Sequence, residues 1–318
     1  MKTNVGYRRA MRRIGMRLAI GIVSAAALAT TAHAAIPPSE RQALVDLYTS
    51  TEGDAWSNDE GWLGAAGTEC NWYGVTCDDA GAHVTELRLA MNRLGGTLPS
   101  LAALPHLQRF DIDSNSVGGS LPPLAGLAEL RFFHAEQNEL TGAVPPLAGL
   151  AELESFDVGY NMLEGSLPPL TGLPALKYFS VYANGVTGTL PSLAALGNLV
   201  EFTVGFNELS GSLPPLAGLA NLAYFDVRYN AFAGALPSLD GLANLENFLV
   251  SHNALNGVVP DVPHPNAMYT GSSELCPNHF EPTPNADWDD VTDSAPWYTE
   301  CTPVSDTIFA NGFELPSG

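Results

Sequence analysis

The sequence predicts an α/β repeat solenoid, a superhelix of eight 23-residue repeats with a parallel β-sheet on one face. Eight asparagines stand 23 residues apart from Asn92 to Asn253, without an insertion or a deletion. A constant period of roughly 20 to 50 residues is typical of stacked copies of one supersecondary unit. Two cysteines precede the array and two follow it, so we also expect a disulfide-bonded cap at each end.

Residues 1–34 have the pattern of a secretion signal. Five arginines up to Arg17 precede an apolar run over residues 18–29, and an A-x-A cleavage site ends at Ala34. The apolar run is short for a membrane span. A twin-arginine signal at Arg12-Arg13 and an uncleaved anchor remain as alternatives. We therefore expect an exported protein, secreted, cell-surface or periplasmic, whose mature chain does not insert into the membrane.

Residues 35–82 are predicted to form an N-terminal cap. Ser39 and Gln42 have the spacing of a capping box at the start of an amphipathic helix. Trp56, Trp62 and Trp72 add large apolar side chains. The first repeat has no neighbour before it, so its apolar edge needs such cover.

Residues 83–260 hold the repeat array. In each repeat an alternation such as Phe156-x-Val158 predicts a short strand. The asparagine that follows, Asn161 in this copy, is expected to turn inward and satisfy backbone groups that the bend leaves unpaired. We therefore interpret the row of asparagines as structural.

Residues 261–303 are predicted to form a C-terminal cap, and residues 304–318 a flexible tail. Three cysteine pairings are possible, and the local one is favoured because the array separates the two pairs. Zinc binding is disfavoured because no other cysteine or histidine nearby has suitable spacing. The predicted disulfides join Cys70 to Cys77 and Cys276 to Cys301.

The charge distribution limits the classes of partner. Without residues 1–34, seven basic residues remain against 34 acidic ones, for a net charge of −27. This balance argues against nucleic acids and anionic membranes, and it favours encounter with basic partners. No phosphate-binding loop, catalytic triad or metal-ligand spacing stands out. We expect a monomer without a cofactor and without enzymatic activity.

Outward positions of neighbouring strands should form rows about 4.8 Å apart, free of the constraints of the core. One group of these outward residues is acidic and lies toward the N-terminal side. Like charges stacked on a sheet destabilise it unless something neutralises them. We interpret this group as a hydrated acidic face in which His134 compensates charge, with a cation or a basic partner side chain as the alternative. Its members are Asp111, Asp113, His134, Glu136 and Asp157.

A second outward group lies toward the C-terminal side and is rich in aromatic residues. Exposed tyrosine and arginine contribute much of the binding energy in typical interfaces. Stacking on a sugar ring and ordinary β-propensity are the alternatives. The predicted ligand-binding residues are Tyr178, Tyr182, Glu201, Phe206, Tyr224, Asp226, Arg228 and Tyr229.

The repeat Leu-x-x-Phe-x-Val-x-x-Asn-x-Leu-x-Gly-x-Leu-Pro resembles leucine-rich repeats of the plant-type subclass, and the stretch 71–77 resembles that family's N-terminal cap motif. The resemblance implies a right-handed superhelix with a second short strand in each repeat. It also implies recognition of ligands, as in receptor ectodomains and inhibitors of pectin-degrading polygalacturonases. The period here is 23 instead of the usual 24, and no Asn-x-Ser/Thr sequence occurs, which points to a bacterial exported member.

These observations favour a binding module that recognises a protein or polysaccharide ligand through its variable sheet face. Two alternatives remain open. One is an inhibitor of an extracellular glycan-degrading enzyme, which the resemblance implies. The other is a surface or matrix spacer without a specific ligand.

Overall fold

The computed structural model describes residues 35–265 and 267–301. The predicted signal peptide and the predicted tail lie outside the described residues, as do the last two residues of the predicted C-terminal cap. Among the described residues, no helix has the length and apolar character needed to cross a membrane.

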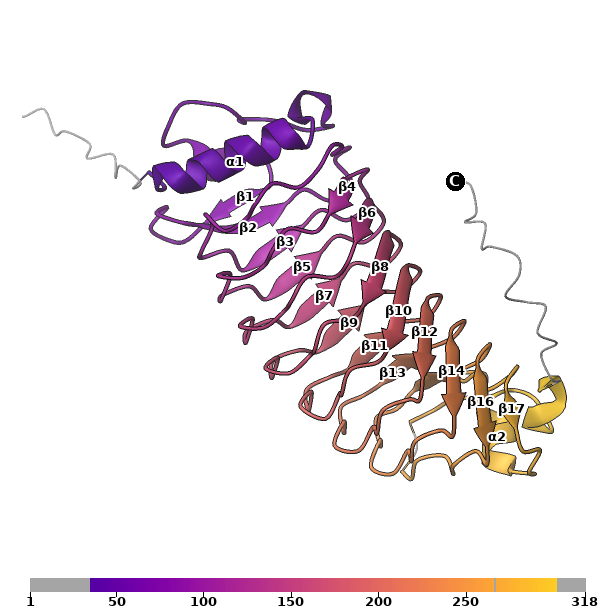
Figure 1. The fold of residues 1–318 in the computed structure, drawn as a ribbon. Helices are drawn as coiled ribbons and strands as arrows, with labels where there is room; N and C mark the ends of the chain where they lie inside the picture. The colour runs from indigo at the N-terminus through magenta and orange to yellow at the C-terminus, as the bar shows by residue number, and fades with distance from the viewer. Residues whose placement is uncertain (1–34, 266, 302–318) are drawn as a thin grey trace, which may run out of the picture. The chain divides into compact units, whose positions relative to one another are not determined.

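An N-terminal cap covers the first repeat (Figure 1). Helix α1 (Pro38–Ser50) buries Leu44 and Leu47. Strand β1 (Val75–Cys77) pairs antiparallel with β2 (Val84–Arg88), so the first parallel strand is not left as an open edge. Two short turns and four contacting aromatic rings complete the cap: η1 (Gly53–Ala55), η2 (Glu69–Asn71), and Tyr48, Trp56, Trp62 and Trp72.

The start of α1 corrects one prediction. Pro38 occupies the first turn, where a backbone N–H has no intrahelical acceptor, so the missing N–H of proline costs no hydrogen bond. No side chain caps the helix. Gln42 Nε2 donates to Asp46 Oδ1 at 2.8 Å instead of reaching back to the helix start. The predicted capping box is therefore wrong, because the ring of Pro38 sets the boundary and Ser39 already lies inside the helix.

Two sheets run the length of the array (Figure 1). The first has nine strands, all parallel except β1, and includes β3 (Arg109–Asp111), β5 (Phe132–His134), β7 (Ser155–Asp157), β9 (Tyr178–Ser180), β11 (Glu201–Thr203), β13 (Tyr224–Asp226) and β15 (Asn247–Leu249). The second has eight strands, β4 (Gly118–Ser120), β6 (Glu139–Gly142), β8 (Met162–Ser166), β10 (Gly185–Thr189), β12 (Glu208–Gly211), β14 (Ala231–Gly234), β16 (Ala254–Gly257) and β17 (His279–Phe280). The second strand that the resemblance implied is thus present. Between residues 84 and 257 the connections are turns and bends without a helix, so the array itself is a β-solenoid.

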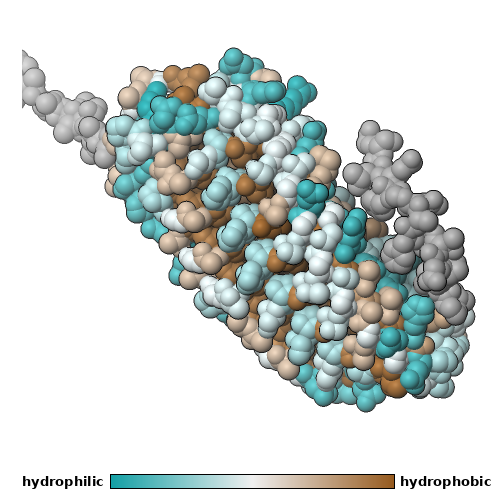
Figure 2. Space-filling view, viewed as in Figure 1, coloured by the Kyte–Doolittle hydropathy of each residue, from teal (hydrophilic) through white to brown (hydrophobic). Residues whose placement is uncertain are grey.

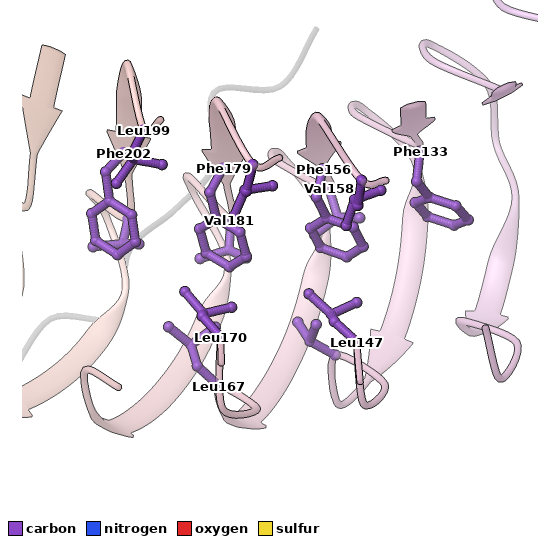
Figure 3. Close-up of a cluster of buried hydrophobic side chains, with 14 of the residues drawn as sticks. Phe133, Leu147, Phe156, Val158, Leu167, Leu170, Phe179, Val181, Leu199 and Phe202 are labelled. Atoms are coloured by element: carbon purple, nitrogen blue, oxygen red, sulfur yellow. The ribbon is translucent and has the colours of Figure 1, made fainter. Parts of the chain in front are cut away.

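Phenylalanines form the centre of the core. Seven of them, one from each of seven successive repeats, stack with ring centroids 5.4 to 5.9 Å apart. Figure 3 shows Phe133, Phe156, Phe179 and Phe202 in line, with leucines such as Leu170 facing them. The four labelled rings are fully buried. On the visible surface, hydrophobic residues recur in bands separated by hydrophilic ones (Figure 2).

The asparagines have the structural role that the sequence predicts. Asn161 is 6% exposed, and its Nδ2 lies within hydrogen-bond distance of Ala135 O, Val158 O and Gly159 O, at 2.9, 3.1 and 2.9 Å. Its Oδ1 accepts from Leu140 N at 2.9 Å. One amide side chain therefore satisfies backbone groups of two adjacent repeats.

A ninth asparagine extends this ladder into the C-terminal cap. Asn278 Nδ2 donates to Val250 O and Leu275 O at 2.8 and 2.7 Å, and its Oδ1 accepts from Leu255 N at 2.9 Å. The sequence analysis missed this position because Asn278 follows Asn253 by 25 residues instead of 23. The cap thus begins as an irregular ninth repeat.

The rest of the C-terminal cap closes over the end of the core. Helix α2 (Ala286–Val291) buries Trp288 completely, and Asn285 caps this helix by accepting from the backbone N–H groups of its first turn. The short turn η3 (Trp297–Glu300) buries Trp297. The predicted disulfides are confirmed: Cα atoms are 5.5 Å apart in Cys70–Cys77 and 4.8 Å apart in Cys276–Cys301.

Candidate functional site

The nine-stranded sheet directs one row of side chains into the core and the next toward solvent. On β9, Phe179 is fully buried while its neighbour Tyr178 is 44% exposed. The register pairs equivalent positions of successive repeats, so that Tyr178 lies beside Glu201 and Glu201 beside Tyr224. Outward residues 23 positions apart in sequence therefore form rows across the sheet face.

One such row is aromatic over five repeats, and we call it the aromatic row. Its neighbouring ring centroids lie 5.3, 5.2, 4.2 and 3.8 Å apart in chain order. Three members belong to the predicted ligand-binding set, whereas Tyr160 and His252 do not. The row consists of Tyr160, Tyr182, Phe206, Tyr229 and His252.

The backbone bend before each ladder asparagine positions this row. The residue at that place has a left-handed φ in all eight repeats, including 50° at Tyr160, 49° at Tyr229 and 56° at His252. Such values are uncommon outside glycine, so the repeat geometry itself imposes them. The signal that identifies Tyr160 and His252 in the sequence is therefore their position directly before an asparagine of the ladder.

Tyr182 enters the row by a local exception. Its repeat has the small Ala183 at the bend, and the ring of Tyr182, one residue earlier, lies next to Phe206 instead. Gly205 makes room for this ring, since a Cβ atom there would lie 3.1 Å from Tyr182 Cε2. Burial is the main cause that raises the pKa of Tyr182 to about 12, followed by the charge of Asp226.

The rings of the C-terminal part of the row lie face to face. Phe206 and Tyr229 are inclined by 22°, and Tyr229 and His252 by 15°. Tyr229 is nevertheless 40% exposed, and Tyr160 is 46% exposed. Stacking therefore covers ring faces in the C-terminal part of the row, while Tyr160 and Tyr229 still reach solvent.

A second row begins the strands β9, β11 and β13. It consists of Tyr178, Glu201 and Tyr224, all from the predicted set. Partial burial raises the pKa of Glu201, and the charges of Asp157 and Asp226 raise it further. Burial also raises the pKa of Tyr224, with a second contribution from Asp226.

Asp226 and Arg228 form an internal ion pair. Asp226 is 1% exposed, and its Oδ2 accepts from Arg228 Nη2 at 2.9 Å. Arg228 Nη1 also donates to Glu274 Oε1 of the C-terminal cap at 2.9 Å. Both charges are therefore already paired, and Glu274 is a member of the site that sequence spacing did not indicate.

Not every outward position is free of packing constraints, contrary to the expectation from the sequence. Ser155 and Thr203 are each 7% exposed, and Ser251 is fully buried. Ser155 Oγ lies 2.8 Å from His134 Nε2, Ser251 Oγ donates to Glu274 Oε2 at 3.0 Å, and Arg228 holds Asp226. An outward position on a strand therefore does not by itself place a side chain in solvent.

The acidic group assembles as the sequence predicts. Ligand atoms of Asp111, Asp113 and His134 all lie within 4.8 Å of one another, close enough to hold a metal ion. Burial raises the pKa of Asp113 to about 7, and the charges of Asp111, Asp157 and Glu136 add to this rise. Asp113 Oδ1 accepts from Glu136 N at 2.7 Å, which opposes the rise without cancelling it.

His134 does not supply the compensating charge that we expected from the sequence. Burial lowers its pKa and outweighs the attraction of Asp111 and Asp157, so the imidazole is neutral at neutral pH. Its Nε2 lies 2.8 Å from Ser155 Oγ. The acidic group therefore keeps its net negative charge.

No protein-family model matches this sequence, and no curated protein matches it either.

Among solved structures, the chain is similar to the leucine-rich-repeat ectodomain of the plant membrane receptor kinase GASSHO1/SCHENGEN3 from Arabidopsis thaliana, solved in complex with CASPARIAN STRIP INTEGRITY FACTOR 2. The TM-score is 0.68, with 26% identity over 79% of this chain. A structure of a TDR receptor has a TM-score of 0.50, with 27% identity over 65% of this chain. This chain covers 31% and 42% of those two chains, so it spans less than half of either. In fold, the chain is a leucine-rich-repeat solenoid.

Proposed function

We propose that this chain is an exported, non-catalytic binding module that recognises a protein ligand through the outward face of its nine-stranded sheet. The aromatic row is the observation that carries the proposal. Five aromatic rings in contact across five repeats form a surface that a single extended ligand can contact along its length. Large, rigid aromatic side chains contribute strongly to binding at low cost in conformational entropy.

The orientation of the rings favours a protein ligand over a polysaccharide. Stacking on a sugar requires an open ring face, whereas Phe206, Tyr229 and His252 cover one another's faces. Ring edges and hydroxyl groups remain, which suit contacts with apolar side chains and backbone carbonyls of a peptide. The similar Arabidopsis ectodomain was solved in complex with a protein factor, which supports the same class of ligand.

The predicted residues have different roles in this proposal. Tyr178, Phe206 and Tyr229 contact the ligand directly. The buried pair of Asp226 and Arg228 acts as support, since it fixes the surface between β13 and the C-terminal cap. The predicted signal and the two disulfides, which persist in oxidising compartments, support export. We also propose a bacterial source, because the sequence contains no Asn-x-Ser/Thr site for N-glycosylation.

The test is selection of binders from a displayed library of random 12-residue peptides by the mature chain, residues 35–318. Binders are then measured against a variant with Tyr160→Ala and Tyr229→Ala. Its matched control carries Tyr73→Ala and Tyr269→Ala, which removes two tyrosines that are 38% and 58% exposed outside the row.

We expect the row variant to lose about tenfold or more in affinity while the control keeps it, since truncating an interface anchor typically costs more than about 1 kcal/mol. Equal loss in both variants, or binders indifferent to both, would refute the sheet-face site. Recovery of no binder at all would favour the spacer function. Inhibition of an extracellular glycan hydrolase at stoichiometric amounts would favour the inhibitor function.

A further inference from the structure

Among the described residues, five carboxylates on the sheet face form no ion pair with a basic side chain, and we call them the carboxylate strip. They come from strands β3 and β11 and from repeats between them. Within residues 35–265 and 267–301, none of the five forms an ion pair with lysine, arginine or histidine, whereas other acids such as Glu154 and Asp226 do. The strip consists of Asp111, Asp113, Glu136, Asp157 and Glu201.

The strand register brings members of the strip close together, since Asp111, His134 and Asp157 lie at the same position of β3, β5 and β7. The charge of Asp157 acts on Asp113, Glu136 and Glu201, and in each of them it adds to the effect of burial in raising the pKa. Asp157 is therefore the electrostatic centre of the strip. Like charges at neighbouring sheet positions destabilise the fold, so a strip of this kind is stabilised when a cation approaches.

Among the described residues, the basic groups on the same face form their ion pairs with acids outside the strip, although the charge of Arg88 also acts on Asp111. Arg228 is paired with Asp226 and Glu274, and Arg88 with Glu86. The guanidinium carbon of Arg109 lies 3.9 Å from the ring centroid of Phe132, over the face of that ring. The neutralising charge is therefore expected from outside the chain.

We propose that the ligand is an extended basic peptide segment whose lysine or arginine side chains lie over the carboxylate strip while its apolar side chains contact the aromatic row. This inference rests on the proposed function and names the class of its ligand. The net charge of −27 without residues 1–34 favours the same class, because it attracts basic partners over a distance.

The length of the strip argues for a peptide. Strands β3 and β11 are four strand spacings apart in the sheet, which corresponds to about 19 Å. An extended peptide covers this length with about six residues, so about three alternate side chains can lie over the strip. A single metal ion at Asp111, Asp113 and His134 would neutralise one end and leave Asp157 and Glu201 uncompensated.

The experiment uses the peptides selected on the mature chain, with histidine-containing sequences set aside. Two variants are compared. One carries Asp157→Asn and Glu201→Gln in the strip. The control carries Glu164→Gln and Glu208→Gln, two exposed acids of the second sheet, so both variants lose the same net charge.

We expect the selected peptides to be enriched in lysine and arginine, and we expect the strip variant to weaken their binding about tenfold while the control changes it less than twofold. Equal losses of affinity in the two variants would show that net charge alone attracts the peptides, and would overturn the strip as their binding site.

The outcomes separate this inference from the proposed function. Binders that depend on Tyr160 and Tyr229 but carry no excess of basic residues, and that tolerate the strip variant, would leave the proposed function standing and overturn the basic ligand. Tight binding of Zn²⁺ or Mn²⁺ by the chain alone, blocking the peptides and lost with His134→Ala, would assign the strip to a metal ion instead. Failure to select any binder would count against both.

Discussion

Tyr229 and His252 stack with their ring centroids 3.8 Å apart and their planes inclined by 15°, although they belong to different repeats. Both residues precede a ladder asparagine, and both have a left-handed backbone, with φ of 49° and 56°. The same bend therefore carries both rings to the same place on the sheet face. It follows that the repeat geometry and the candidate binding surface depend on one another.

Gly205→Ala should disturb the aromatic row while leaving the core intact. The new Cβ would lie 2.9 Å from Asp226 Oδ1 and 3.1 Å from Tyr182 Cε2, so the carboxylate has to shift and the tyrosine ring has to give way slightly. We expect a loss of about 1 kcal/mol in stability and a clear loss of peptide affinity. Gly197→Ala is the matched control, because a Cβ there meets nothing within 4 Å. Equal peptide binding by the two variants would contradict the role of Tyr182.

Asn161→Ala should destabilise the array by about 3 kcal/mol, measured by urea unfolding. The change leaves Leu140 N without its acceptor, and it removes the shorter of two side-chain hydrogen bonds to Ala135 O, inside the protein. Asn198→Ala removes a single exposed hydrogen bond to Pro174 O and should cost less than about 0.5 kcal/mol. Similar costs for the two variants would show that the ladder is not the structural element described above.

Asp113→Asn should stabilise the protein at pH 8 and have little effect at pH 4. The folded state raises the pKa of Asp113 to about 7, through burial and the charges of Asp111, Asp157 and Glu136. In the unfolded chain the pKa is about 3.9, so the folded state binds more protons between these values and loses stability as the pH rises. His134 faces the same group, and burial lowers the pKa of its imidazole.

The free energy of unfolding is measured from pH 4 to pH 8 for wild type and Asp113→Asn. We expect the two curves to separate by about 1 kcal/mol at pH 8, after allowance for solvent screening of this partly exposed group. Asp240→Asn, at an exposed position away from the strip, should give a curve parallel to that of wild type. A constant difference across the whole pH range would contradict the electrostatic explanation.

Replacing Cys276 and Cys301 by serine should loosen the C-terminal cap before the array unfolds. The bridge closes a loop with a sequence separation of 25, and removing it is expected to cost about 3 kcal/mol. Trp288 and Trp297 are 0% and 2% exposed, so a red shift of tryptophan fluorescence at low urea reports the opening. The corresponding change at Cys70 and Cys77, with a separation of 7, should cost about 1 kcal/mol less by loop entropy. An unchanged fluorescence transition would show that the cap is held by packing alone.

Much of the site could be predicted from the sequence because the repeats place outward positions in register. The acidic group around Asp113 and the tyrosines at Tyr178 and Tyr224 were found in this way. Tyr160 and His252 were missed, although Phe206 and Tyr229 at the same bend position were predicted, because the prediction did not treat the bend position as a row of its own. The neutral state of His134 depends on burial, which no spacing reveals.

The period, the two caps and the asparagine ladder can be inferred from the sequence alone, and the local cysteine pairing is favoured there, because each of these depends on residues in a repeated or local pattern. The three-dimensional packing was needed to show which outward side chains are buried, which charges are paired and which rings touch. Asp226 illustrates the difference: it occupies an outward position, yet Arg228 covers it and Glu274 of the cap holds Arg228 in place. Such contacts depend on the size and direction of side chains from neighbouring repeats, and a repeat pattern does not contain that information.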